Sequence, residues 1–336
     1  MDNRGTIIIA EVGVNHNGSL GMAKDLVDVA CSAGADFVKF QTFKASEIAT
    51  IGAKKADYQV NNTVPDESQF DMLKNLELAD EDYLEILHYC ENKSITCFST
   101  AFDIASIEFL KKNNQKYFKI PSGEITNLPY LEHIGSLGAE VFLSTGMSTL
   151  KEISRALKIL ESSGTDKGNI TVLHCTSQYP AAICDVNLNA MLSIKKEFDV
   201  KVGYSDHTSG THIALAAVAL GAKVIEKHFT LDRKLKGPDH EASIEPLELE
   251  YMISSIRSIE ESFGDGKKRV MPGEVENINI VRKSIVAKKD IKEGEIFSEE
   301  NITSKRPGNG ISPMEWHDVI GKRAQSNFKV DELIRL

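Results

Sequence analysis

Hydrophobic residues along this chain fall into short runs rich in β-branched and aromatic side chains, and a longer stretch of helical periodicity follows most of them. A short apolar run bounded by turn residues is typical of a buried strand, whereas apolar positions that recur every three to four residues indicate an amphipathic helix. The pattern predicts strands at 6–11, 37–42, 96–100, 117–120, 140–144, 170–176, 201–205 and 224–228.

The stretches between these strands have helix signals at their ends. Ser19 and Asp103 stand at N-cap positions, Thr149 and Glu152 have the spacing of a capping box, and glycine follows several of the stretches. We therefore expect helices near 19–33, 81–92, 103–113, 127–136, 149–162, 188–198, 209–220 and 246–263.

The alternation of eight strands with eight helices favours a (β/α)8 TIM barrel of the α/β class. An open, doubly wound sheet is the alternative, but the glycines after the first strand do not form a dinucleotide-binding fingerprint. Residues 43–80 are too long for an ordinary connection, so we expect a lid or binding loop, in which Met72 and Leu73 serve for packing. The domains expected are a barrel over 1–264, a linker over 265–282 and a small β-rich domain over 283–336.

Composition excludes several classes of function. The 336-residue chain has 39 basic and 49 acidic side chains, a net charge of −10 with neutral histidines. This charge argues against binding to nucleic acid or to an anionic membrane. Because Glu11 interrupts the first apolar run and no run approaches about 18 residues, neither a signal peptide nor a membrane span is expected. The five scattered cysteines favour reduced thiols and a cytoplasmic location.

Polar side chains gather at the carboxyl ends of the predicted strands, where TIM barrels have their active sites. Residues two apart on a strand share one face, so Lys227 should face the helix layer while its neighbours face the barrel. Contact with water also makes strand ends polar, but it does not account for so many of them. The candidates are Glu11, Lys39 with Gln41, Ser99, Lys119, Ser144, His174, Ser205 with His207, and Glu226 with His228.

These residue types indicate particular kinds of chemistry. His207 and His228 end neighbouring strands, so both imidazoles can reach one divalent ion, unless they are simply solvated or core histidines. Lys39 and Lys119 are costly inside a barrel without a partner, which points to an anionic ligand or to a Schiff base. Glu11 is a candidate general base or the ion-pair partner of one lysine.

Taken together, the motifs at these strand ends resemble those of the sialic acid synthase family, which makes N-acetylneuraminate and related nonulosonic acids. The match covers nearly the whole chain, and its short motifs occur in the order and spacing of the family. They lie at 10–18, 38–42, 119–124, 143–147, 174–176, 179–180, 205–207, 226–230, 237–239 and 306–310.

The resemblance implies a TIM barrel followed by an antifreeze-like (SAF) domain. It also implies an N-acetylneuraminate synthase, which condenses phosphoenolpyruvate with N-acetylmannosamine and water to give N-acetylneuraminate and phosphate. The family forms homodimers in which the C-terminal domain is swapped onto the partner's barrel. One alternative is a legionaminate synthase that uses a 2,4-diacetamido-6-deoxy-mannose. Another is a Schiff-base sugar aldolase, and a carbohydrate- or ice-binding tail is a third.

The resemblance also implies roles for single residues. Glu11 and Glu226 would be catalytic, with Glu11 as the general base. His207 and His228 would hold a divalent metal, typically manganese, with magnesium or cobalt as alternatives. Ser177 stands where relatives often have asparagine, which is longer and has more donors. Phosphoenolpyruvate contacts are expected at Lys39, Lys119, Ser122, Ser144, Ser177 and Ser205, and sugar contacts at Gln41, Tyr179, Asp239 and Arg306.

Overall fold

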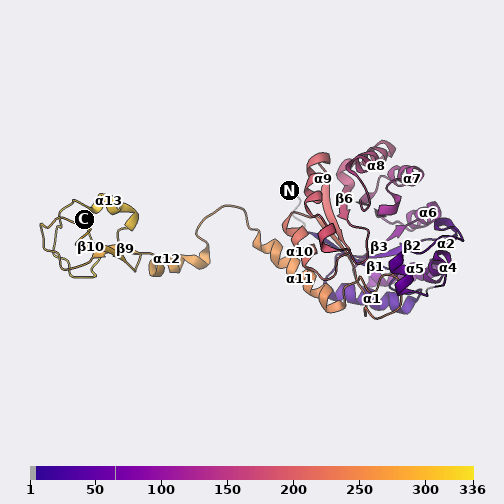
Figure 1. The fold of residues 1–336 in the computed structure, drawn as a ribbon, viewed down its shortest axis with the longest axis horizontal. Coiled ribbons are helices and arrows are strands. Elements are labelled where there is room, and N and C mark those ends of the chain that lie inside the picture. Colours follow the sequence, from indigo (N-terminus) through magenta and orange to yellow (C-terminus); the bar gives the residue numbers. More distant parts are fainter. Residues whose placement is uncertain (1–4, 65) are drawn as a thin grey trace. The chain divides into compact units, whose positions relative to one another are not determined.

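The computed structural model describes all residues except 1–4 and 65 (Figure 1). The chain divides into two compact units, of which the first ends at Phe263 and the second runs from Gly264 to Leu336. Within the described part of the chain, no helix has both the length and the apolar character that a membrane span requires. The cytoplasmic location expected from the sequence stays a prediction.

The first unit is a TIM barrel, which confirms the predicted fold class. Its parallel strands are hydrogen-bonded in the order β3-β2-β1-β8-β7-β6-β5-β4, and contact between β3 and β4 closes the barrel. The strands are β1 (Ile7–Gly13), β2 (Phe37–Thr42), β3 (Thr96–Ala101), β4 (Tyr117–Ile120), β5 (Glu140–Ser144), β6 (Ile170–Cys175), β7 (Lys201–Asp206) and β8 (Val224–His228).

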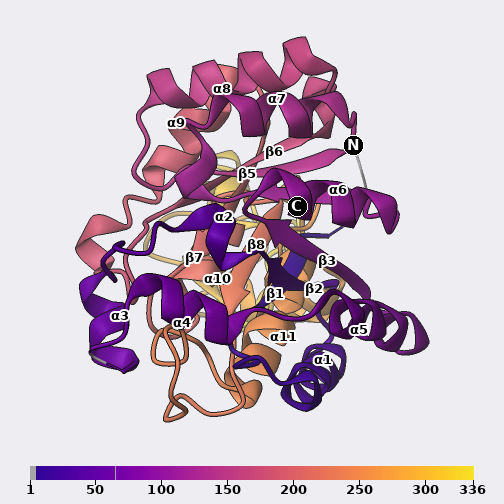
Figure 2. The same ribbon diagram turned by 90° about the vertical axis from the view of Figure 1, so that its right-hand side faces the viewer.

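Helices surround these strands (Figure 2). The predicted caps Ser19, Asp103 and Thr149 each accept a hydrogen bond from a backbone N–H of the first turn, so the local sequence sets where these helices begin. The surrounding helices are α1 (Leu20–Ala33), α5 (Asp80–Asn92), α6 (Ile104–Lys112), α7 (Leu128–Ser136), α8 (Leu150–Ser163), α9 (Asn189–Phe198), α10 (His212–Ala219) and α11 (Pro246–Ser262).

Apolar side chains from six strands meet in one cluster and fill the interior of the barrel. Because side chains on a strand alternate, the residue two positions further along faces the same interior, nearer the carboxyl end. The apolar layer inside the barrel is therefore followed, at the carboxyl ends of the strands, by a layer of mostly polar side chains. The pairs are Ile9 and Glu11, Phe37 and Lys39, Phe98 and Thr100, Phe142 and Ser144, Leu173 and Cys175, and Val224 and Glu226.

The long connection after β2 is folded rather than irregular. The Lys55 ammonium, whose side chain is 2% exposed, donates to Thr63 Oγ1 (3.0 Å) and to the carbonyl of Val64. These bonds close a small loop within the connection. Phe43 and Met72 pack in an apolar cluster that anchors the segment at its base. Its helices are α2 (Ala45–Ile48), α3 (Asp57–Asn62) and α4 (Gln69–Leu76).

The second unit has its own small apolar core, built around Phe297 and Phe328. The antiparallel strands β9 (Ser284–Ala287) and β10 (Ile302–Lys305) form its sheet. Part of the predicted linker belongs to this unit, because the Gly308 N–H donates to the carbonyl of Asn279 in α12. Its helices are α12 (Val275–Val281) and α13 (Trp316–Val319), and 3-10 helices of the described chain lie at Ser122–Glu124, Lys167–Asn169, Ile183–Asp185, Pro272–Glu274 and Pro313–Glu315.

Candidate active site

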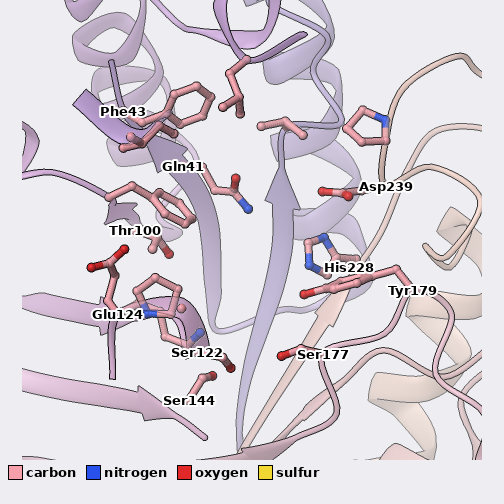
Figure 3. Close-up of a pocket in the computed structure, with 18 of the residues that line it drawn as sticks. Gln41, Phe43, Thr100, Ser122, Glu124, Ser144, Ser177, Tyr179, His228 and Asp239 are labelled. Carbon is pink, nitrogen blue, oxygen red and sulfur yellow. The ribbon is translucent and has the colours of Figure 1, made fainter. Parts of the chain in front are cut away.

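A cavity of about 470 Å³ lies at the carboxyl ends of the barrel strands, and residues of the long connection after β2 line one part of it (Figure 3). Most of the site residues expected from the sequence meet here. Arg306 lies in the second unit, where its Nε donates to the carbonyl of Val281 (3.1 Å). The expected residues that line the cavity are Gln41, Lys119, Ser122, Ser144, Ser177, Tyr179, Ser205, His207, Glu226, His228 and Asp239.

Four buried charges stand at the centre of the site, and we call Glu11, Lys39, Lys119 and Glu226 the charge quartet. Lys39 Nζ lies 2.6 Å from Glu11 Oε2 and 3.6 Å from Glu226 Oε2. Lys119 Nζ lies 3.2 Å from Glu226 Oε1. Each side chain is at most 5% exposed, so the charges are held by one another rather than by water. The ion-pair role considered for Glu11 is therefore real.

The two carboxylates of the quartet differ in their surroundings. Burial raises the pKa of Glu11 to about 7, with Lys39 opposing this rise and Glu226 adding to it. Burial also acts on Glu226, but the two lysines and a hydrogen bond from Ser205 (2.8 Å) hold its pKa well below the usual range. Glu11 can thus exchange a proton near neutral pH, whereas Glu226 stays ionised.

Lys39 remains charged in this environment. Burial lowers its pKa, but the carboxylates of Glu11 and Glu226 together raise the pKa above its ordinary value. Its ammonium also donates to Thr100 Oγ1 (2.9 Å). A Schiff-base lysine must lose its proton to attack a carbonyl, so this arrangement disfavours Lys39 as a nucleophile.

The two strand-end histidines are both neutral, because burial lowers the pKa of His207 to about 4 and brings that of His228 well below its usual value. Their ring centroids are 5.8 Å apart. His207 Nδ1 donates to the carbonyl of Thr176 (2.7 Å), which leaves Nε2 with its lone pair and accepting from the Tyr179 hydroxyl (3.1 Å). His228 Nδ1 is buried with no hydrogen-bond partner in the described structure.

This donor set fits a divalent ion that also binds substrate. Neutral imidazoles with available lone pairs are good ligands for such ions, and the carbonyl that fixes the His207 tautomer is a usual companion of a ligating histidine. No group of three or more His, Cys, Asp or Glu residues converges on one point within the described residues. Two histidines would therefore leave coordination positions for substrate oxygens or water.

A group of hydroxyls, which we call the serine cluster, lies beside Lys119 and consists of Ser122, Ser144 and Ser177. Ser122 Oγ accepts from the Gly146 N–H (3.0 Å), and the buried Ser144 hydroxyl has no hydrogen-bond partner in the described structure. A Cβ at Gly146 would lie 2.1 Å from Ser177 Oγ and 2.8 Å from Ser122 Oγ. The hydroxyls converge because this position is glycine, and they form a cradle for anionic oxygens.

Tyr179, Asp239 and Gln41 line the same cavity as the two histidines. Figure 3 shows Tyr179, His228 and Asp239 on one side of the cavity and Ser122 on the other. Burial raises the pKa of Asp239 to about 6. Gln41 Nε2 donates weakly to Glu11 Oε1 (3.4 Å), and this bond connects the lining of the cavity to the charge quartet. Polar groups therefore surround the space between the histidines and the serine cluster.

Four strand-end candidates are not among the residues that line this cavity. Glu11 and Lys39 face the barrel interior and belong to the charge quartet, whereas the alternation of their strands places Ser99 and His174 on the other face. Phe98 and Leu173 belong to the barrel interior, so the next residues, Ser99 and His174, point away from it. Ser99 Oγ bonds to Thr42 Oγ1 (2.7 Å), and His174 Nε2 donates to the carbonyl of Val186 (2.7 Å).

By the same alternation Lys227 lies outside the cavity, and its predicted orientation toward the helix layer is confirmed. Its ammonium is fully buried and pairs with Asp206 Oδ2 (2.8 Å).

Several lining residues were missed by the sequence analysis. Thr100 is a polar residue at the end of the predicted third strand, like the other candidates, but the sequence pattern pointed to Ser99 as the site residue of that strand. Phe43, Met72 and Leu76 come from the connection after β2. Met72 packs in the apolar cluster, as the sequence predicted, and it also lines the cavity. No strand-end rule points to residues in such a connection, because its path over the barrel depends on tertiary packing.

Known proteins resemble this chain over nearly its whole length. Residues 26–268 match the NeuB family, and residues 282–336 match the SAF domain. The N,N'-diacetyllegionaminic acid synthase of Campylobacter jejuni is 56% identical over 330 residues, which are 98% of this chain and 99% of that protein. The synthase of the same name from Legionella pneumophila is 45% identical over 323 residues, 96% of this chain and 91% of that protein.

A solved structure agrees with these relatives. The crystal structure of an N-acetylneuraminic acid synthetase from Leptospira borgpetersenii, in complex with citrate, has a TM-score of 0.71 at 33% identity. The similarity covers 82% of this chain and 91% of that one.

Fold, site and relatives define the class of protein as a nonulosonic acid synthase, an enzyme that condenses phosphoenolpyruvate with an amino sugar. The chain belongs to the NeuB family, with a SAF domain at its C-terminal end. The resemblance to the sialic acid synthase family and the expectation of an enzyme are both confirmed. Family membership also leaves the Schiff-base aldolase without support.

The Glu11→Gln variant tests the general base. The amide keeps the shape and hydrogen bonds of the side chain but cannot take up a proton, so kcat should fall about 100-fold. The measurement is phosphate release at saturating substrate, with the exposed Glu132→Gln as the matched control at the wild-type rate. A loss confined to the KM for phosphoenolpyruvate would instead make Glu11 a positioning residue.

Proposed function

We propose that this enzyme condenses phosphoenolpyruvate with a 2,4-diacetamido-6-deoxy-mannose to form N,N'-diacetyllegionaminic acid and phosphate. The observation that carries the proposal is the 56% identity, over almost the full length of both chains, to a synthase of that acid. A second synthase of the same name at 45% identity supports it. The sequence analysis placed N-acetylneuraminate first, and the relatives reverse that order.

N-acetylneuraminate synthesis from N-acetylmannosamine remains the second candidate. The solved synthetase named for that acid shares the fold of this chain, but only 33% of its residues are identical. Both reactions need the same phosphoenolpyruvate site and the same carbon–carbon bond formation. The two candidates differ in the groups on the sugar, so the sugar end of the cavity distinguishes them.

In our proposal the serine cluster and the lysines hold phosphoenolpyruvate. Lys119 faces the cavity beside the hydroxyls of Ser144 and Ser122, and within the described structure Glu226 is its one ion-pair partner. A lysine ammonium next to the unpartnered Ser144 hydroxyl offers both charge and donors to the carboxylate and phosphate oxygens. Because the whole chain is acidic, this local positive charge must be concentrated within the cavity to attract a trianionic substrate.

The reaction then forms one carbon–carbon bond and one carbon–oxygen bond to water, and it breaks the carbon–oxygen bond to phosphate. C3 of phosphoenolpyruvate attacks the aldehyde carbon of the open-chain sugar, and positive character develops at C2. The ionised Glu226 offsets this charge, and water adds to C2 while Glu11 takes up its proton. The bond between C2 and the bridging oxygen breaks, phosphate leaves with both of the bond's electrons, and the C2 hydroxyl loses its proton to become the keto carbonyl. The alkoxide formed from the aldehyde takes up one of the released protons.

His207 and His228 would hold a divalent metal, for which manganese is our first proposal. Such an ion supplies a Lewis acid for the aldehyde oxygen, where negative charge develops. The carbonyl of Thr176 at Nδ1 and ring contact with Tyr179 at 4.2 Å between centroids keep the ring of His207 in place, and the Tyr179 hydroxyl would give up Nε2 to the ion. The protein thereby orients one ligand before any ion binds.

The choice of sugar is tested by kcat/KM for phosphate release. We expect the diacetamido-6-deoxy sugar to be used at least about tenfold better than N-acetylmannosamine, because contacts to a second acetamido group add transition-state binding. N-acetylmannosamine 6-phosphate serves as the negative control, since no additional phosphate cradle was found in the sequence. A higher kcat/KM for N-acetylmannosamine would make the enzyme an N-acetylneuraminate synthase.

Metal dependence gives a further prediction. Treatment with EDTA should abolish phosphate release in the wild type, and added manganese should restore it, because loss of a Lewis acid removes several kcal/mol of transition-state stabilisation. His228→Ala should stay inactive with manganese and bind less of it by elemental analysis. The control is His88→Ala, whose side chain is 73% exposed on α5. Full activity in EDTA would overturn the metal assignment.

We also propose a homodimer in which the SAF domain of each chain completes the partner's active site. Arg306 matches a family position that contacts the N-acetyl group, and it belongs to a unit separate from the barrel. Its guanidinium is exposed, with one bond to a backbone carbonyl. A closed two-fold arrangement gives both barrels an equivalent tail.

Complementation between two inactive chains tests the swap. His228→Ala and Arg306→Ala chains carrying different tags are co-expressed, and each is inactive on its own. Random pairing gives half heterodimers, each with one intact site of two, so about a quarter of wild-type activity should return. If tagged heterodimers form and activity stays at the level of the separate variants, each tail serves its own barrel.

A further inference from the structure

The cavity has two chemically different ends. Figure 3 shows Phe43 on the far side of the cavity from Ser144 and Ser177. Phe43, Met72 and Leu76 are each at most 8% exposed, pack in one apolar cluster and also line the cavity, and we call them the lid wall. A sugar bound between the serine cluster and this wall meets charge at one end and hydrocarbon at the other.

The polar side chains that the connection after β2 contributes to this cavity are uncharged. Among the described lining residues that belong to the connection after β2, the only polar side chains are the amides of Gln59 and Gln69. Lysines of the same segment are engaged elsewhere: Lys44 pairs with Asp80 at 2.8 Å, and Lys74 pairs with Glu77 at 2.7 Å. This end of the cavity therefore offers amide hydrogen bonds and apolar contact, without a cation for a phosphate.

The two amides are not equivalent. Gln59 Oε1 accepts from the Ala56 N–H (3.0 Å), so this side chain supports the start of its own helix. Among the described residues the Gln69 side chain has no hydrogen-bond partner, although its backbone is held by a bond from its N–H to the carbonyl of Ala53 (3.3 Å). The half-buried Gln69 amide thus has a fixed backbone, an unused donor and an unused acceptor, and it lines the cavity.

These features match an acetamido group better than a hydroxyl-rich sugar. A primary amide can donate to the carbonyl of an acetamido group and accept from its N–H, while the acetyl methyl contacts hydrocarbon. Hydroxyls pressed against Phe43 and Met72 would lose water without gaining partners, which disfavours binding. A methyl group at carbon 6 does not have this cost.

We propose that Gln69 and the lid wall form the subsite that selects the second acetamido group and the carbon-6 methyl of the sugar. The inference rests on the proposed function and extends it from the identity of the sugar to the residues that recognise it. Gln69 is a specificity-determining residue with no part in the bond-forming steps. Its loss should therefore change the choice between sugars rather than the chemistry.

The test compares kcat/KM for the diacetamido-6-deoxy sugar and for N-acetylmannosamine in wild type and Gln69→Leu. Leucine keeps the bulk of the side chain and removes both hydrogen-bonding groups. We expect kcat/KM for the diacetamido sugar to fall about tenfold and that for N-acetylmannosamine to stay within about twofold. Lys74→Met, on the exposed side of the same helix, is the matched control and should leave both values unchanged.

A second variant tests the subsite even where Gln69→Leu does not fold. Gln69→Glu keeps an acceptor and replaces the donor by a negative charge, so it should also lower kcat/KM for the diacetamido sugar selectively. Equal losses for both sugars, or no loss for either, would overturn the subsite. The proposed function fails separately, when the wild type itself prefers N-acetylmannosamine. A wild-type preference for the diacetamido sugar that survives in both variants would overturn the role of Gln69 alone.

Discussion

Four charged side chains buried at the mouth of the barrel are stable only as a mutually neutralising set. Glu11, Lys39, Lys119 and Glu226 come from four different strands, and the removal of Lys39 or Glu226 leaves a buried charge without its partner. The barrel meets this constraint with its register, in which Glu11 lies directly opposite Lys39 in the adjacent strand. The site thus depends on correct strand pairing, and a slip of one residue would turn these charges into the helix layer.

The same set divides the chemical work between its two carboxylates. Glu226 is shared between two lysines and a serine hydroxyl, so it keeps its charge, whereas Glu11 has one close lysine and a pKa near neutrality. A pair of carboxylates with separated pKa values provides one fixed charge and one group that exchanges protons. Lys119 remains the lysine that faces the cavity and can turn toward an incoming anion.

Much of this arrangement could be predicted because it follows from local rules. The eight strands and their helices came from hydrophobic periodicity, and capping side chains such as Thr149 set helix starts. Strand alternation also placed Lys227 correctly. It failed at Ser99 and His174, since the phase of a strand is visible only once the barrel interior is known. A lid or binding loop was expected over 43–80, but the side chains of the lid wall could not be identified, because they meet where a long connection folds back over the barrel.

A crystal structure of the enzyme with phosphoenolpyruvate would test the account most directly. We predict that its phosphate and carboxylate oxygens lie within hydrogen-bond distance of Lys119 and the serine cluster, with C3 facing the histidines. A second cavity of about 710 Å³, lined by His174 and Thr149, lies beyond Ser177. Phosphoenolpyruvate bound there, with Lys119 still directed only at Glu226, would contradict the claim that the charge quartet and the serine cluster form the substrate site.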